Sequence, residues 1–130
     1  MEQSVVNKTL PPAIKRLSRN STIFKVIIEA IHEKKGEHIV SLDLKKIEEA
    51  VADFFIICEA QSGTQIHAIA NNIEEKVREQ CHEKPFHFEE GTAWTLVDYV
   101  NIVVHIFNPE ERKFYDIEGL WMDANKKEHT

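Results

Sequence analysis

The sequence predicts an α+β protein with a mixed five-stranded sheet and flanking helices, in the order α-β-β-α-β-β-β-α. Three observations lead to this prediction. Residues 54–58, FFIIC, form a continuous apolar run that is typical of a central strand covered on both faces. Residues 91–121 have the pattern of strand, turn, strand and capped helix. Two further segments carry apolar residues at helical spacing between start and stop signals.

A helix and a strand open the folded part of the chain. Ser21 or Thr22 is suited to cap a helix that we expect to run to about Lys35. Residues 38–44 then alternate in the manner of a strand, so one set of side chains lies on each face. One face of this strand would carry Val40, Leu42 and Leu44. Residues 45–52 are expected to form a short polar connection to the apolar run.

A second helix is expected after the apolar strand. Ser62 and Gln65 have the spacing of a capping box, and apolar residues recur at helical spacing as far as Val77, so the helix should end near residue 80. A short edge strand is expected over residues 86–88, because the preceding proline has no N–H to donate to a ladder.

A hairpin is predicted from strands at 94–98 and 101–107. If residues 98–101 close it with two or four loop residues, Trp94 lies opposite His105 and Leu96 lies opposite Val103. These four side chains then share one partly covered face of the sheet. The opposite, core-facing side would carry Thr95, Val97, Ile102, Val104 and Ile106.

The last helical segment has a complete set of start signals. Asn108 suits the N-cap, Pro109 suits the first helical position and Glu111 suits a capping box. An apolar stripe at helical spacing, expected to anchor the segment in the core, comprises Phe114, Ile117, Leu120 and Trp121. Tyr115 lies off this stripe and is expected to be exposed.

Composition and charge restrict the class of protein. A length of 130 residues with 42% hydrophobic residues suits one ordinary domain with a real core. No apolar run approaches the roughly 20 residues of a membrane span, and no secretory signal is recognisable, so we expect a cytoplasmic protein without a membrane partner. The two cysteines have no metal-ligand spacing.

Three segments of the chain are expected to differ in character. Residues 1–22 are predicted to be a flexible basic arm, residues 23–121 the folded domain and residues 122–130 a polar, frayed tail. The arm carries a local charge of +3, which leaves −9 on the remainder of the chain. An acidic body suits a basic protein partner better than a phosphate backbone, so no specific nucleic acid is expected. The alternative is that the charge only confers solubility.

Three blocks of the sequence resemble the ribosomal silencing factor family, also called Iojap-like proteins. The blocks read ADFFIICEAQSGTQIHAIANNIEEKV, EKPFHFEEGTAWTLVDYVNIVVHIF and ERKFYDIEGLW, within a resemblance that covers about residues 23–121. The resemblance implies a nucleotidyltransferase-like fold without transferase activity. It also implies binding to the large ribosomal subunit through its ribosomal protein fourteen, which would sterically block joining with the small subunit and repress translation. A homodimer away from the ribosome is a further implication. Val100 departs from the family, whose members usually have Gly within the hairpin turn.

The residues themselves argue against catalysis and metal binding. A nucleotidyltransferase of this fold needs a Gly-Ser turn and paired carboxylates that hold two metal ions, whereas Ser62-Gly63 has the reverse order and Asp43 lacks an alternating partner. The seven histidines show no H-x3-H spacing. We therefore expect no enzyme, no cofactor and no metal. The alternatives are a degenerate nucleotidyltransferase-like protein that retains nucleotide binding and a scaffold outside translation.

The candidates for the contact with the ribosomal protein are Trp94, Leu96, Asp98, His105 and Tyr115. Tryptophan is enriched at binding hot spots, which favours a contact role for Trp94. The alternatives are that Trp94 and His105 only stabilise the hairpin and that Asp98 only serves its turn. Asp53, just before the apolar strand, is expected either to cap a neighbouring backbone segment or to pair with a basic partner residue.

Overall fold

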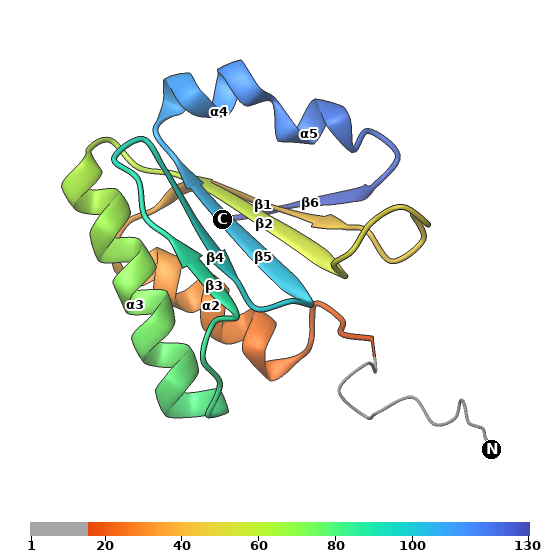
Figure 1. The fold of residues 1–130 in the computed structure, drawn as a ribbon, viewed down its shortest axis with the longest axis horizontal. Helices are drawn as coiled ribbons and strands as arrows, with labels where there is room; N and C mark the ends of the chain where they lie inside the picture. Colours follow the sequence, from red (N-terminus) through yellow and green to blue (C-terminus); the bar gives the residue numbers. More distant parts are fainter. Residues whose placement is uncertain (1–15) are drawn as a thin grey trace.

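The structure, a computed structural model, describes residues 16–130 of the chain. The elements follow one another as α2 (Thr22–Glu33), β1 (Glu37–Asp43), β2 (Phe54–Glu59), α3 (Gly63–Cys81), β3 (His87–Glu89), β4 (Trp94–Asp98), β5 (Ile102–Phe107), α4 (Pro109–Tyr115), α5 (Ile117–Leu120) and β6 (Asn125–His129) (Figure 1). The predicted α+β class is therefore confirmed. None of the helices in this part of the chain is both long enough and apolar enough to cross a membrane.

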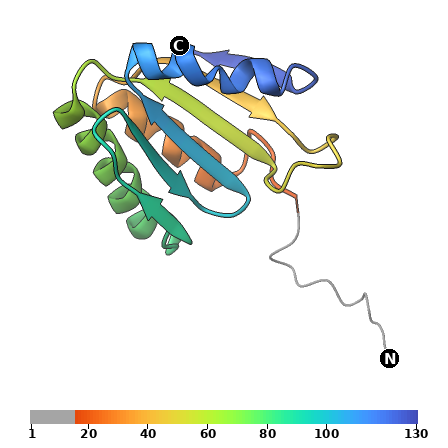
Figure 2. The ribbon, with the colours of Figure 1, turned by 45° about the horizontal axis from the view of Figure 1, so that its top comes forward.

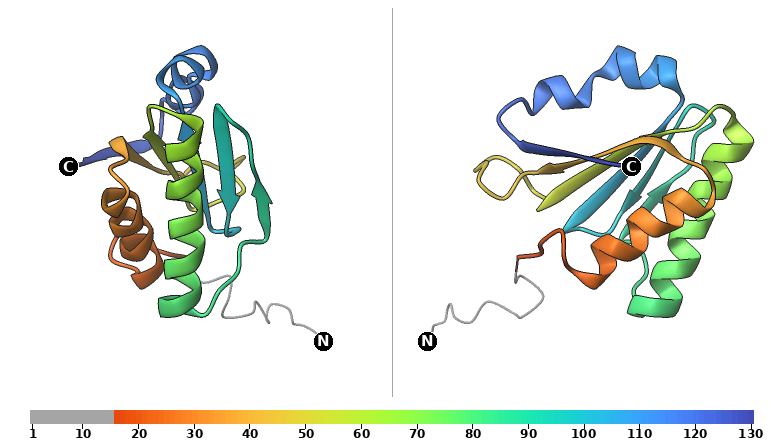
Figure 3. Two further views of the ribbon diagram at one scale, coloured as in Figure 1. Left: turned by 90° about the vertical axis from the view of Figure 1, so that its left-hand side faces the viewer. Right: turned by 180° about the vertical axis from the view of Figure 1, so that it is seen from behind.

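The strands form one mixed sheet in the order β3-β4-β5-β2-β1-β6. β2 pairs in parallel with β5, and the other neighbouring strands are antiparallel. The apolar run predicted to be central lies in β2, between β5 and β1. Helices α2 and α3 pack on one face of the sheet, and the α4–α5 segment crosses the other (Figure 3).

The starts of α3 and α4 agree with the capping patterns, whereas Ser21, at the start of α2, makes no side-chain cap hydrogen bond. Ser62 Oγ accepts a hydrogen bond from Gln65 N at 3.1 Å, and Asn108 Oδ1 accepts one from Glu111 N at 2.8 Å. These bonds satisfy N–H groups that have no partner within the first turn of a helix. α2 begins directly after Ser21 but ends at Glu33, slightly earlier than the sequence predicts.

The strand register of the hairpin differs from the predicted one by two residues. Trp94 pairs with Phe107, and Leu96 pairs with His105. The reason lies in the turn: Val100 has a φ of 73°, and Asn101 N donates to Tyr99 O at 2.9 Å, which closes a three-residue turn centred on Val100. A shift of two residues leaves every side chain on its predicted face, so the division into a core face and a partly covered face is right.

The sheet has six strands where the sequence predicts five. The additional strand, β6, pairs with β1 from Asp43↔Asn125 to Ile39↔His129, within the segment expected to be a frayed tail. Its sequence, NKKEH, has no apolar alternation and is largely exposed, so the strand depends on main-chain bonds to the edge of β1. Side chains add to this, because Arg19 donates to both Asn125 O and Asn125 Oδ1.

The segment before α2 contacts the sheet through Asp53. Residues 1–15 of the predicted arm lie outside the described part of the chain. Asp53 Oδ1 accepts from Arg16 Nη1 at 3.0 Å, and its other oxygen accepts from Leu17 N at 2.9 Å. Asp53 thus caps a neighbouring backbone segment, which is the first of the two alternatives, and the basic residue with which it pairs belongs to its own chain.

Candidate functional site

One region of the sheet is covered by a helix on one side only. α3 packs against β4 and β5 from one face, whereas on the other face the α4–α5 segment lies over β1, β2 and the end of β5 (Figure 2). Within the described residues no helix crosses β3 and β4 on that side (Figure 2). We call this surface the open sheet face and define it by Trp94, Leu96 and Asp98 of β4 together with Tyr115 at the end of α4.

Trp94 is the centre of the open sheet face and connects the sheet to α4. Its indole stacks on the ring of Phe107 with centroids 4.8 Å apart, and its centroid lies 4.8 Å from the ring of Tyr115. Its Nε1 donates to His105 Nδ1 at 3.2 Å. The side chain remains half-buried, so it both packs within the hairpin and presents an edge at the surface.

His105 lies beneath this surface and is only 4% exposed. Because Trp94 donates to its Nδ1, the neutral ring carries its proton on Nε2. Burial lowers the pKa of His105 from 6.5 to about 4, so the ring is neutral near pH 7. Nε2 has no hydrogen-bond partner among the described residues, and the ring of Phe55 packs against the imidazole at 4.7 Å. His105 is therefore placed to orient the indole of Trp94.

The other candidates lie at different distances from Trp94. Leu96 is half-buried and pairs with His105, and Tyr115 is 43% exposed above the indole. Asp98 lies four residues further along β4, which corresponds to about 13 Å. One of its oxygens accepts from Val100 N at 2.7 Å, so this carboxylate does serve the turn. The structure thus brings four of the five candidates together around Trp94, and Asp98 lies at the far end of the same sheet face, beside the turn.

An acidic rim borders these residues on the β3 side. Glu89 pairs with Leu96 across the β3–β4 ladder and therefore lies on the same face, where its carboxylate meets the His87 ring at 3.1 Å. Three apolar side chains of the α4–α5 segment and of the turn after it are also exposed: Phe114, which contacts Tyr115, Leu120 and Met122 are 78%, 76% and 82% exposed.

The expected apolar stripe was wrong for Phe114 and Leu120, which were predicted to lie in the core. Asp116, with a φ of 44°, ends α4 and caps α5, so one continuous helical spacing does not apply across 114–121. Ile117 alone is buried, and Trp121 is partly buried against it. An aspartate tolerates the left-handed conformation better than most residues, and this was the available signal for the break.

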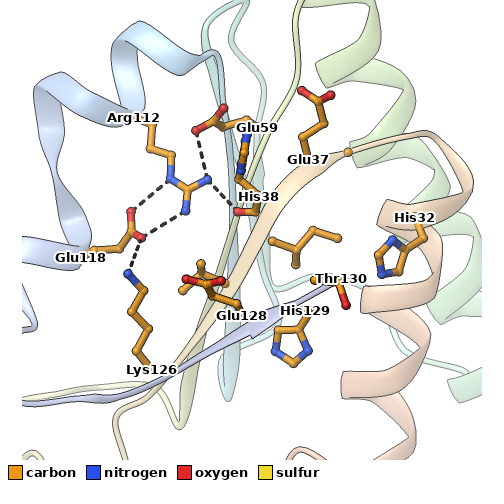
Figure 4. Close-up of a pocket in the computed structure, with 13 residues that line it drawn as sticks. His32, Glu37, His38, Glu59, Arg112, Glu118, Lys126, Glu128, His129 and Thr130 are labelled. Atoms are coloured by element: carbon orange, nitrogen blue, oxygen red, sulfur yellow. Dashed lines mark hydrogen bonds and ion pairs between the residues drawn. The ribbon is translucent and has the colours of Figure 1, made fainter.

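Arg112 determines where α4 lies. It is 8% exposed and donates from Nε and Nη2 to the two oxygens of Glu118, each at 3.1 Å (Figure 4). Its Nη1 donates to His38 O at 2.8 Å and to Glu59 Oε1 at 3.3 Å. Burial alone would raise the pKa of Glu118, but the bonds and charge of Arg112, together with Lys126, lower it below its usual range.

This ionic cluster lines a pocket of about 590 Å³ (Figure 4). The charge of the Arg112 guanidinium in it is already paired with the carboxylates of Glu59 and Glu118, which leaves it little attraction for an anionic ligand. Sequence reasoning did not single out Arg112, because Glu59 and His38 are 53 and 74 positions away.

The remaining reactive residues do not form a chemical centre within the part of the chain that the structure describes. No group of three or more His, Cys, Asp or Glu side chains there is arranged to hold a metal ion. Cys58 is buried, and desolvation raises its pKa to about 12, which keeps it as a thiol. Fold and site together define a small α+β domain whose distinctive surface is an aromatic sheet face beside two short helices.

Comparison with known proteins identifies the family. The family model described as ribosomal silencing factor during starvation matches residues 18–130. The chain is 38% identical over 106 residues to a ribosomal silencing factor of Halalkalibacterium halodurans, covering 81% of this chain and 90% of that protein. A crystal structure of a Chromobacterium violaceum protein is similar with a TM-score of 0.71 and 36% identity, covering 76% of this chain and 82% of that one.

This protein belongs to the ribosomal silencing factor family, whose members are ribosome-associated regulators of translation. A more distant relative, 30% identical over 78 residues, is the mouse mitochondrial assembly of ribosomal large subunit protein 1; the match covers 57% of this chain and 34% of that protein.

Proposed function

We propose that this protein binds the large ribosomal subunit through ribosomal protein fourteen and sterically blocks its association with the small subunit. The observation that carries the proposal is the open sheet face, where Trp94, Leu96 and Tyr115 form an aromatic and apolar surface that α4 meets only at its end, through Tyr115. The name of the mouse relative, which refers to the large ribosomal subunit, supports the choice of subunit. A protein that represses translation by occupying the joining surface needs affinity for that surface and sufficient size, and it need not catalyse a reaction.

The contact would be centred on Trp94. Its indole is held by Phe107, Tyr115 and His105, so its conformational freedom is lost before binding. An anchor that is already ordered binds with less entropic cost than a mobile side chain. His105 acts in this proposal by holding Trp94, since the imidazole is too deeply buried to contact a partner.

Charge on the rim indicates the chemistry of the partner. Glu89 and Asp98 lie on the open sheet face, and the whole chain carries a net charge of −6. Such a surface attracts a basic protein and repels a phosphate backbone at the same place. We therefore propose a protein partner for this face, in the cytoplasm, and a homodimer through the same apolar surface when the ribosome is absent.

The experiment is sedimentation of purified subunits through a sucrose gradient with and without the protein. Wild type should reduce the amount of joined ribosomes, and equal joining in both samples would show that silencing is wrong. The interface is tested with Leu96→Lys, which places a cation against the basic partner, and with Trp94→Ala. Both should weaken capture of the ribosomal protein by at least about tenfold, equivalent to about 1.4 kcal/mol.

Phe86→Ala is the matched control. Phe86 is 79% exposed and lies just before β3, outside the open sheet face, so its removal should leave capture unchanged. Trp94→Ala leaves a cavity, so the circular dichroism of each variant is measured as well. If Leu96→Lys is folded and binds as wild type does, the open sheet face is not the interface.

A further inference from the structure

A second surface lies at the opposite edge of the sheet, between α2 and β6. It is a groove of about 510 Å³ that includes Arg19 from the turn before α2, Lys25 from α2 and Lys127 from β6. We call it the α2–β6 groove. β6 and β3 are the two edges of the sheet, so the groove is separate from the open sheet face.

The α2–β6 groove is basic in a protein whose overall charge is −6. Three cations line it, and Glu29 is its one carboxylate. Within residues 16–130, neither Arg19 nor Lys25 nor Lys127 forms an ion pair with a carboxylate. Their charge is therefore not neutralised locally, in contrast to that of Arg112.

Arg19 is held in place by neutral groups. Its guanidinium donates to Ser41 Oγ at 2.8 Å, to Ser41 O at 3.4 Å and to the backbone and side-chain oxygens of Asn125 at 2.8 and 2.9 Å. These bonds fix the position of the cation without cancelling its charge. A positioned cation loses less side-chain entropy when it meets an anion.

His129, at the end of β6, experiences the same positive field. Its Nε2 lies within hydrogen-bond distance, 2.8 Å, of Ser41 Oγ, the same hydroxyl oxygen that accepts from Arg19 Nε. Burial lowers the pKa of His129, and the charges of Lys127, Arg19 and His32 lower it further. Several positive groups from α2 and β6 thus converge on one groove.

We propose that the α2–β6 groove binds the phosphate backbone of RNA without sequence preference. A binding peptide would need apolar anchor sites, and the groove offers few, since Phe24 is only 2% exposed and Ile28, which is partly buried, is the other large apolar side chain that lines it. A phosphate backbone needs only cations placed at separate points, which α2, β6 and the preceding turn supply. This contact goes beyond the proposed function, because it involves another surface and another class of partner.

The test is the fluorescence anisotropy of a short fluorescein-labelled single-stranded RNA titrated with the full chain. Three phosphate contacts predict a slope of log affinity against log salt of about −2, so affinity should fall about tenfold between about 50 and 150 mM salt. The double variant Lys25→Glu/Lys127→Glu should lose at least about tenfold in affinity at low salt and bring the slope to about −0.7 or shallower.

The control is the double variant Lys46→Glu/Lys84→Glu, which changes the net charge equally at exposed lysines outside the groove. It should bind RNA within about twofold of wild type. Equal affinity of the two double variants would overturn the proposal, as would binding of polyglutamate as tightly as RNA, which would indicate an acidic protein instead. No ribosome is present in this assay, so its failure would leave the proposed function intact.

Discussion

Arg112→Met removes the ionic clamp that holds α4 to the sheet while keeping the aliphatic volume of the side chain. In the wild type the guanidinium makes two bonds to Glu118, one to Glu59 and one to His38 O. Methionine replaces none of them. The variant therefore leaves two carboxylates without their cation and one carbonyl without its donor.

The loss in the free energy of unfolding can be estimated from how deeply the partners of Arg112 are buried. Removing one member of a fully buried ion pair costs about 3–5 kcal/mol, because the remaining charge is left desolvated. The side chains of Glu59 and Glu118 are 17% and 22% exposed, so water can reach them in part. Lys126 also remains 3.6 Å from Glu118. We expect the free energy of unfolding to decrease by about 2–3 kcal/mol.

Urea denaturation followed by circular dichroism measures this difference. Lys113→Met, at the exposed neighbouring position of α4, is the control and should change stability by less than about 0.5 kcal/mol. Binding to the ribosomal protein should weaken in Arg112→Met as well, because α4 carries Tyr115 to Trp94. A loss of stability below about 1 kcal/mol would refute the reasoning, since the carboxylates would then be hydrated as easily as surface groups.

Two further predictions concern the hairpin. Burial holds the folded pKa of His105 near 4, against 6.5 for an exposed imidazole, so the unfolded chain binds the proton first as the pH falls. The free energy of unfolding should therefore decrease as the pH falls from 6.5 to 4, by up to about 3 kcal/mol. Urea denaturation at several pH values should show a weaker pH dependence of stability in His105→Phe than in the wild type. Val100→Gly should raise the melting temperature and stabilise the fold by about 1 kcal/mol, because glycine adopts a φ of 73° without strain. A lower melting temperature would mean that the valine side chain contributes more than its backbone strain costs.

Local patterns predicted most of the fold because their causes are local. Capping at Ser62 and Asn108 depends on residues three positions away, and both caps are present. The alternation of β4 and β5 depends on a period of two, so both faces of the hairpin were assigned correctly although the register was not. The register depended on the turn, where Val100 adopts a conformation that β-branched residues rarely occupy.

The sequence predictions fail where a segment distant in the chain determines the local structure. β6 has no strand signal of its own and forms because the edge of β1 offers unpaired backbone groups to residues more than 80 positions later in the chain. Phe114 and Leu120 are exposed because Asp116 interrupts the helix and only Ile117 turns to the sheet. Neither outcome can be read from periodicity, since each depends on what lies opposite in space.

The sequence by itself determined the class of fold, the two faces of the hairpin and the candidate set around Trp94, because side-chain direction follows the period of a strand. Only the tertiary structure decided how deeply each of these side chains is buried. Phe55 of β2 and Trp94 of β4 close over His105, so the histidine lies beneath the surface that it was expected to form. Burial is a property of neighbours brought together by folding, and those neighbours are remote from one another in the chain.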